Sequence, residues 1–430
     1  MRFIKHFCFA LLLMCTALGA NAALQLQITG GINEGRKIAV LPFEQPDNIG
    51  TDIASVVSAD LMRSGKFSPL AQSQIPANAL AGGALNLKAF EGSPAEAVVF
   101  GKVYPEGSTY QVEFQLVGLK GAQQGQVIAH YRGPSGIPTM RQAAHRVSDR
   151  VYQHLTGQPG AFRTRIAYIV YKHGEPFPYQ LMTADYDGFN EVPVLKSTQP
   201  IMTPSWSPDG TRIVYVSFER RVPAIFIQDI NTKQRVKLAS YPGLNSSPAW
   251  SPDGTKIAMT LSYEGGQPDI YYYDLEQKKL VRVTANPAID TEPTWSADSK
   301  ALYFTSERGG GAQIYKFDFN TRKSERVTYQ GRMNLSAKSI PGSNALVVIT
   351  NQNGYRVARM DADGSIYMLT TSSLDESPSV APNGSMIIYS TVYQGRKGLA
   401  IVSADGRFKA NLPSTSGEVS APAWGPLLEK

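Results

Sequence analysis

One short motif occurs six times in the second half of the chain, and its period constrains the fold more than any other feature. In full form it is Pro-x-Trp followed by a Ser-Pro-Asp-Gly turn, as in the copies that begin at Pro204 and Pro248. The equivalent positions are 206, 250, 295, 339, 380 and 424, so the spacings are 44, 45, 44, 41 and 44 residues. A period in the low forties is typical of a four-stranded propeller blade.

The two ends of the repeat array indicate how the ring closes. The run Arg165–Tyr171 looks like the second strand of a blade, but no Pro-x-Trp strand precedes it. At the other end, Pro422-Ala-Trp424 is a first strand with no further strand after it. The strand count balances only if the C-terminal strand completes the first blade, which also removes exposed sheet edges. We therefore predict a six-bladed β-propeller over residues 163–430, closed by the C-terminal strand.

The region before the propeller mixes helical and strand patterns and predicts a small α/β domain over residues 36–158. Apolar residues recur there at helical spacing in some segments and at strand spacing in others. The expected elements are a buried strand, a helix, a hairpin and a second helix, at Lys37–Phe43, Ile49–Arg63, Ala97–Tyr104 with Thr109–Leu116, and Ile137–Leu155. The predicted fold class is thus multidomain, an α/β domain followed by an all-β propeller.

The first 22 residues have the pattern of a secretory signal. A basic start is followed by an apolar run over residues 7–18 and by Ala20-Asn-Ala22, which predicts cleavage after Ala22. No stretch of the chain is long enough to span a membrane, so no transmembrane anchor is expected. Cys8 and Cys15 both lie in the signal. The exported chain would therefore have no disulfide, no cysteine nucleophile and no cysteine metal ligand.

The sequence contains none of the usual catalytic signatures. Nucleophile elbows, Walker A loops and zinc motifs are absent, and a net charge of +7 without a dense basic stripe argues against nucleic-acid binding. Residues 185–188 and 361–364 begin like calcium loops, but Lys196 and Ser372 stand where an EF-hand requires glutamate. We interpret the repeated aspartates Asp209, Asp253 and Asp298 as turn residues. No metal, no cofactor and no enzymatic activity are expected.

Two segments are candidates for protein binding. The segments just before the Pro-x-Trp motifs mix apolar and acidic residues, and in a ring we expect them to be loops that meet on one face around the central opening. They are residues 200–203, 244–247, 288–292, 332–335 and 373–377. That composition suits capture of a protein segment, although ordinary solvated loops explain it equally well. The second candidate, the N-terminal segment 23–35, alternates apolar and polar residues. It could add to the sheet edge of a partner or form the first strand of its own domain.

Four stretches make the chain resemble the TolB family, the periplasmic component of the Tol–Pal system of Gram-negative envelopes. They are LTGQPGAFRTRIAY (155–168), DTEPTW (290–295), LDESPSVAPNGSMIIYS (374–390) and DGRFK (405–409). The resemblance implies a periplasmic adaptor that supports outer-membrane integrity and constriction during cell division. Its partners would be the lipoprotein Pal and the protein TolA, and in some hosts colicins or phage proteins.

The resemblance also implies which residues bind. The Pal-binding positions on the propeller face would be Leu244, Asn245, Ser246, Ser247, Thr291, Glu292, Pro293, Asp375 and Glu376. The TolA-binding positions in the N-terminal segment would be Leu24, Gln25, Leu26, Gln27 and Ile28. It further implies that this segment is either free for TolA or docked on its own protein.

A second hypothesis comes from a different class of protein. An exported hydrolase or lyase could act on saccharide or peptide through the propeller channel. It would need acid, base or metal-binding residues that converge in the ring, and the sequence offers few histidines and no cysteine there.

Overall fold

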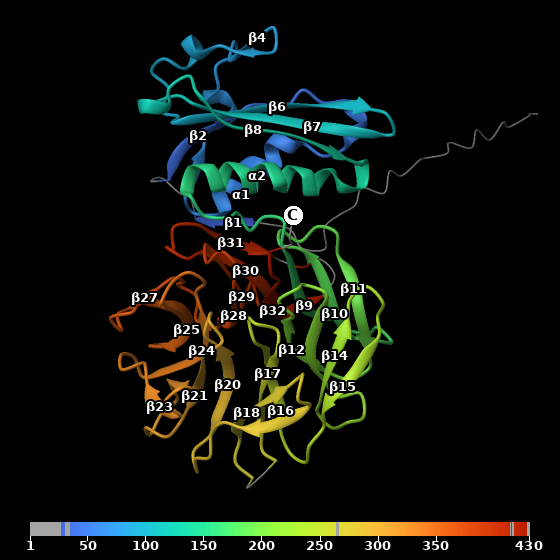
Figure 1. Cartoon of the computed structure of the whole chain (residues 1–430), viewed down its shortest axis with the longest axis vertical. Helices are drawn as coiled ribbons and strands as arrows, with labels where there is room; N and C mark the ends of the chain where they lie inside the picture. Colours follow the sequence, from blue (N-terminus) through green and yellow to red (C-terminus); the bar gives the residue numbers. More distant parts are fainter. Residues whose placement is uncertain (1–26, 31–34, 264–265, 413, 415–416, 428–430) are drawn as a thin grey trace, which may run out of the picture.

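The computed structural model describes residues 27–30, 35–263, 266–412, 414 and 417–427. It consists of a small α/β domain and a larger ring of β-sheets, and Figure 1 shows the small domain lying across one side of the ring. The predicted signal, residues 1–22, and the candidate residues Leu24, Gln25 and Leu26 lie outside the described residues. Among the described helices, none has the length and apolar character needed to cross a membrane.

The small domain is a five-stranded mixed sheet with two helices. In the strand order β3-β2-β6-β7-β8, β2 is parallel to β3 and β6, and the other pairs are antiparallel. The strands are β2 (Arg36–Val40), β3 (Phe67–Pro69), β6 (Ala97–Glu106), β7 (Thr109–Gly118) and β8 (Val127–Ser135). The helices are α1 (Ile53–Arg63) and α2 (Met140–Thr156), and a small hairpin joins β4 (Leu80–Ala81) to β5 (Ala84–Leu85).

The predicted start of the first helix is wrong by four residues. Ile49 ends a short 3₁₀ turn, and Gly50 follows in the left-handed region at a φ of 67°. The helix begins only after Asp52, whose Oδ1 accepts a hydrogen bond from the Ser55 backbone N–H at 3.2 Å. An N-cap aspartate satisfies a backbone donor that the first helical turn leaves free. The capping residue therefore sets the start, although apolar spacing continues upstream.

The ring is a six-bladed β-propeller, as predicted, and each blade is an antiparallel sheet. Blade 1 contains β9 (Arg165–Tyr171), β10 (Tyr179–Asp185), β11 (Val192–Ser197) and β32 (Glu418–Trp424). Blade 2 contains β12 (Ile201–Trp206), β13 (Arg212–Ser217), β14 (Ala224–Asp229) and β15 (Arg235–Ala239), and blade 3 contains β16 (Asn245–Trp250), β17 (Lys256–Leu261), β18 (Asp269–Asp274) and β19 (Lys279–Arg282). Blade 4 contains β20 (Asp290–Trp295), β21 (Ala301–Ser306), β22 (Gln313–Asp318) and β23 (Lys323–Arg326). Blade 5 contains β24 (Met333–Ser339), β25 (Leu346–Asn351), β26 (Tyr355–Met360) and β27 (Ile366–Met368), and blade 6 contains β28 (Glu376–Val380), β29 (Met386–Tyr393), β30 (Arg396–Ser403) and β31 (Lys409–Leu412).

The C-terminal strand closes the ring, which confirms that prediction. β32 pairs antiparallel with β9, with Ser420 opposite Ile169 and Trp424 opposite Ile166. The turn residues also behave as predicted, because Asp209 Oδ1 accepts hydrogen bonds from the Thr211 backbone N–H at 3.0 Å and from Ser207 Oγ at 2.5 Å. The equivalent aspartates of the next two blades make the same bond to a serine two residues before them.

The N-terminal strand β1 (Gln27–Gly30) is not the first strand of the small domain, because it is docked on the propeller. It pairs antiparallel with β31 of blade 6, with Gln27 opposite Asn411 and Ile28 opposite Ala410. Blade 6 is thereby extended to the strand order β1-β31-β30-β29-β28. In Figure 1, β1 lies between the ring and the helices of the small domain.

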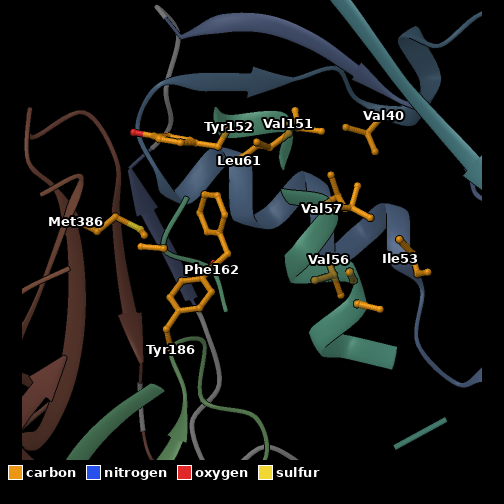
Figure 2. Packing of buried hydrophobic residues seen from close by; sticks show 14 of the residues in the cluster. Val40, Ile53, Val56, Val57, Leu61, Val151, Tyr152, Phe162, Tyr186 and Met386 are labelled. Atoms are coloured by element: carbon orange, nitrogen blue, oxygen red, sulfur yellow. The ribbon is translucent and has the colours of Figure 1, made fainter. Parts of the chain in front are cut away.

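The two domains share one apolar core. Phe162 and Tyr186 lie between the helices of the small domain and Met386 of blade 6, as Figure 2 shows, and all three side chains are fully buried. The same cluster includes Leu61 of α1 and Val151 of α2. Burial of large side chains on both sides of a junction stabilises one relative orientation of the domains.

Candidate functional site: the mouth of the propeller channel

The innermost strands of the six blades share a feature that shapes the central channel. Each strand is interrupted by a register shift, and at that point one residue has φ between 46° and 54°. All six residues line a channel of ≈ 420 Å³. We call them the mouth ring: Thr203, Ser247, Glu292, Ser336, Ser377 and Ala421. A bulge of this kind bends a strand and turns a side chain in a new direction.

The segments before the Pro-x-Trp motifs are mostly β-strand and not loop. They were expected to be loops, but β16 begins at Asn245 and β20 begins at Asp290, so most of their residues belong to the innermost strands. Ser247 and Glu292 stand in the mouth ring, and Ser246 and Thr291 come directly before them. The sequence could have indicated this, because in five blades the mouth-ring residue is followed by proline.

Buried Asn and Asp side chains fix the backbone just before the mouth ring. They stand two residues before the mouth ring, as Asn245, Asp290, Asn334 and Asp375. Asn245 Oδ1 accepts from the Tyr241 backbone N–H at 2.9 Å, and its Nδ2 donates to the Tyr241 carbonyl at 2.7 Å. Thr391 Oγ1 donates to Asp375 Oδ1 at 2.7 Å. Asn245 and Asp375 are candidate residues, and this arrangement lets them shape the surface from beneath it.

Glu292 connects two blades. Its carboxylate accepts hydrogen bonds from Thr305 Oγ1 at 2.9 Å, from the Ser336 backbone N–H at 3.0 Å and from Ser336 Oγ at 2.7 Å. Ser336 belongs to blade 5, whereas Glu292 and Thr305 belong to blade 4. A carboxylate with three donors is charged, rigid and already hydrogen-bonded, so it can present a fixed negative surface at the mouth.

Apolar side chains surround the mouth. Met202, Leu244 and Leu374 are 47%, 37% and 57% exposed. A second hollow of ≈ 470 Å³ adjoins the mouth, and its apolar lining is Leu335, Ile349, Tyr355, Leu374 and Val392. Glu376 stands on its rim and is paired with Lys397 at 3.0 Å. Exposed apolar residues around a rigid polar centre are typical of a protein-binding surface.

A second polar cluster lies at the junction of the domains, and the sequence analysis missed it. Asp60 of α1, His145 of α2 and Asp187 of the propeller are all fully buried, and their ligand atoms lie within 4.8 Å of one another. His145 Nδ1 donates to Asp60 Oδ2 at 2.7 Å, and His145 Nε2 faces Asp187 Oδ2 at 3.6 Å. No sequence signal joins these residues, since they come from three distant segments.

This junction cluster has the residue types of a metal site, but it is already occupied by cations. Arg63 Nη1 lies 3.1 Å from Asp60 and 3.6 Å from Asp187, and Arg141 is paired with Asp187. Two guanidinium groups beside the carboxylates repel a metal ion, so the set fits an ionic network better. Burial lowers the pKa of His145, but the carboxylates of Asp60 and Asp187 outweigh it, so the pKa is raised above its ordinary value.

Comparison with known proteins identifies the family. A family model described as the TolB beta propeller domain matches residues 152–428, and one described as the TolB amino-terminal domain matches residues 24–124. The chain is 45% identical over 414 residues to the "Tol-Pal system protein TolB" of Mannheimia succiniciproducens, covering 96% of this chain and 94% of the relative.

Two further relatives agree with these matches. The chain is 44% identical over 421 residues to the protein of the same name from Haemophilus influenzae, covering 96% of each. The crystal structure of TolB from Acinetobacter baumannii superposes with a TM-score of 0.86 at 38% identity, covering 94% of this chain and 100% of that chain. This chain therefore belongs to the TolB family.

Proposed function

We propose that this chain is a periplasmic, non-enzymatic adaptor of the Tol–Pal system, exported by a signal that is cleaved after Ala22. It binds Pal through the mouth of the propeller channel and TolA through the N-terminal segment. By connecting these partners it supports outer-membrane integrity and constriction during cell division. The observation that carries the proposal is that the channel mouth and the N-terminal strand lie on opposite edges of the same sheet, blade 6.

The channel mouth has the properties that a protein partner requires. Its backbone is held by bulges and buried Asn and Asp side chains, so little conformational entropy is lost when a partner binds. Leu244 and Leu374 offer apolar contact, and Glu292 offers a fixed charge. Of the other candidates, Ser247 and Pro293 line the channel with Glu292, and Glu376 lines the adjoining hollow with Leu374. Ser246 and Thr291 belong to the innermost strands β16 and β20.

The N-terminal strand has the properties of an exchangeable segment. Among the described residues β1 contributes Gln27–Gly30 to the outer edge of blade 6, and its pairing with β31 contains a register irregularity after Ile28. An edge strand is hydrogen-bonded to its sheet on one side only, so a partner sheet edge can compete for it. In the docked state Gln27 and Ile28 pair with blade 6, and in the free state they are available to TolA.

Charge reversal at the mouth tests the Pal site. We expect Glu292→Arg to weaken Pal binding about 30-fold, or ~2 kcal/mol, because it reverses the charge and breaks the bonds to blade 5. Isothermal titration calorimetry measures the affinity, and circular dichroism verifies the fold. Glu276→Arg, at an exposed outer turn, is the matched control. Unchanged affinity in a folded Glu292→Arg protein would remove this residue from the site.

A cross-strand disulfide tests the role of β1. Gln27 and Asn411 are register partners, and partners in an antiparallel pair are close enough for a disulfide. We expect the oxidised Gln27→Cys, Asn411→Cys protein to lose TolA binding and to regain it on reduction. Deletion of residues 23–33 should abolish TolA binding under both conditions. If the oxidised protein binds TolA as well as the reduced one, exchange of β1 is not required.

The hydrolase or lyase hypothesis has weaker support. Among the described residues that line the channel, the charged ones are Glu292 and Lys338. The Glu292 carboxylate accepts three hydrogen bonds, which leaves it poorly placed to take a proton from substrate.

A further inference from the structure

The channel wall departs from its own repeat in one blade. Two residues after the mouth ring stands a second ring, which lines the same channel and consists of Ser205, Ala249, Thr294, Lys338, Ser379 and Ala423. Five of these residues are small and neutral. Blade 5 differs, because it alone has a lysine in this ring and Ala337 replaces the proline of the other five blades; the tryptophan position is Ser339 here and Val380 in blade 6. A local break in an otherwise regular pattern is where a functional requirement is expected to show.

Lys338 brings a positive charge into the channel without a direct partner. Within the described ranges its ammonium forms no ion pair and no hydrogen bond. The nearest acidic group in the wall is Glu292, whose oxygens already accept from Thr305 and Ser336. Burial lowers the pKa of Lys338 below its ordinary value, and the charge of Glu292 opposes this effect only in part. A lysine ammonium has three donors, so this group is prepared to bind an acceptor that enters the channel.

Hydroxyl groups of the same ring can complete such a site. Ser379 Oγ accepts from the Trp424 backbone N–H at 2.9 Å, and Ser205 Oγ accepts from the Trp250 backbone N–H at 3.2 Å. Both oxygens are therefore held in place as acceptors. Among the described residues neither hydroxyl has an acceptor for its own hydrogen. Each can donate that hydrogen into the channel, as the ammonium of Lys338 can.

We propose that the propeller channel contains an anion site, centred on Lys338, that takes a carboxylate. The ammonium supplies the charge, and Ser379 and Ser205 supply further donors in a narrow space with low-dielectric proline and tryptophan walls. The carboxylate has two sources, a free small anion or an acidic group of the protein docked at the mouth. Only the second source rests on the proposed function.

Fluorescence quenching tests the anion site without any partner. Trp206, Trp250 and Trp424 line the channel, so iodide that collects there quenches their emission. We expect the iodide quenching constant of the unmodified protein to be about twofold that of Lys338→Met, and acetate to lower it toward the variant's value. Lys338→Arg keeps the charge and should keep the effect. Lys237→Met, on the exposed outer edge of blade 2, should also leave it unchanged.

A neutral quencher and Pal binding complete the experiment. Acrylamide quenching should be equal in all variants, which verifies that the channel is intact. Equal iodide quenching in the unmodified protein and Lys338→Met, or no effect of acetate, overturns the proposal. If the iodide difference is found, weaker Pal binding by Lys338→Met identifies a partner carboxylate, and unchanged binding identifies a free anion. If the iodide difference is found but the unmodified protein does not bind Pal, the proposed function is refuted and the anion site stands.

Discussion

At the scale of single residues, His145 joins the two domains through charge. Both of its ring nitrogens face carboxylates, Asp60 on one side and Asp187 on the other. Only the protonated imidazole can present a donor to both. Because Asp187 belongs to the propeller and His145 to the small domain, its charge stabilises the contact between them.

The raised pKa of His145 predicts a stability that falls as the pH rises. The folded pKa lies above the unfolded value of ~6.5, so the stabilisation is complete below that value and is lost as the pH rises through the folded pKa. We expect His145→Gln to lower the free energy of unfolding by about 2 kcal/mol near pH 6 and by less near pH 9. Urea unfolding at several pH values measures this.

His154 provides the control for that prediction. It lies on the same helix, α2, but is exposed and has no carboxylate partner among the described residues. We expect His154→Gln to follow the pH dependence of the unmodified protein. If His145→Gln shows the same pH dependence as His154→Gln, the junction does not depend on the charge of His145.

At the scale of elements, β32 both closes the ring and contributes to the domain junction. It joins the end of the chain to the first blade, and its Trp424 is buried at the junction. Trp424 Nε1 donates to Thr164 Oγ1 at 2.8 Å, and the indole stacks on Tyr186 with ring centroids 5.9 Å apart. One side chain therefore stabilises both ring closure and the domain contact.

Truncation of this tryptophan should destabilise the molecule strongly. We expect Trp424→Ala to lower the free energy of unfolding by about 4 kcal/mol, because it leaves a large cavity and removes the hydrogen bond to Thr164. Guanidinium unfolding measures the loss. Leu427→Ala, three residues further on and exposed, should change stability by less than about 0.5 kcal/mol. A loss of under about 1 kcal/mol for Trp424→Ala would mean that closure depends on the strand backbone instead.

At the scale of the whole molecule, the small domain approaches the ring very closely at Gly65. A Cβ at this position would lie 2.6 Å from Ser403 Cβ in blade 6, and the residue has a φ of 74°. Nearby, Lys66 pairs with Asp405 of the same blade at 3.3 Å. The position therefore requires glycine for two reasons, its backbone conformation and the contact between domains.

These two reasons can be separated with a matched glycine. Gly157 follows α2 at a φ of 75° with nothing within 4 Å of a Cβ, so Gly157→Ala introduces only the backbone strain. We expect Gly65→Ala to destabilise the protein by about 2 kcal/mol more than Gly157→Ala. Amide hydrogen exchange in β31 should be faster in Gly65→Ala than in the unmodified protein, and unchanged in Gly157→Ala. Equal effects of the two substitutions would mean that the domain contact tolerates a methyl group at Gly65.

The number of blades and the closure of the ring followed from the sequence by itself. Each blade is a local unit whose turn, Pro-x-Trp strand and period recur along the chain, so counting equivalent positions such as Trp206 and Trp250 was sufficient. The start of α1 was predicted less well, because its cap at Asp52 competes with apolar spacing that begins at Ile49.

Only the tertiary structure decided how distant segments meet. His145 and Asp60 are 85 residues apart, and β1 pairs with a strand near the opposite end of the chain. Local periodicity records which face of a segment is buried, but not against which partner. Likewise, nothing in the sequence singled out Lys338, and only the family resemblance singled out Glu292; the bulges of the innermost strands bring both residues to the channel. Blade architecture was therefore readable from local patterns, whereas the channel, the docked strand and the junction arose from long-range packing.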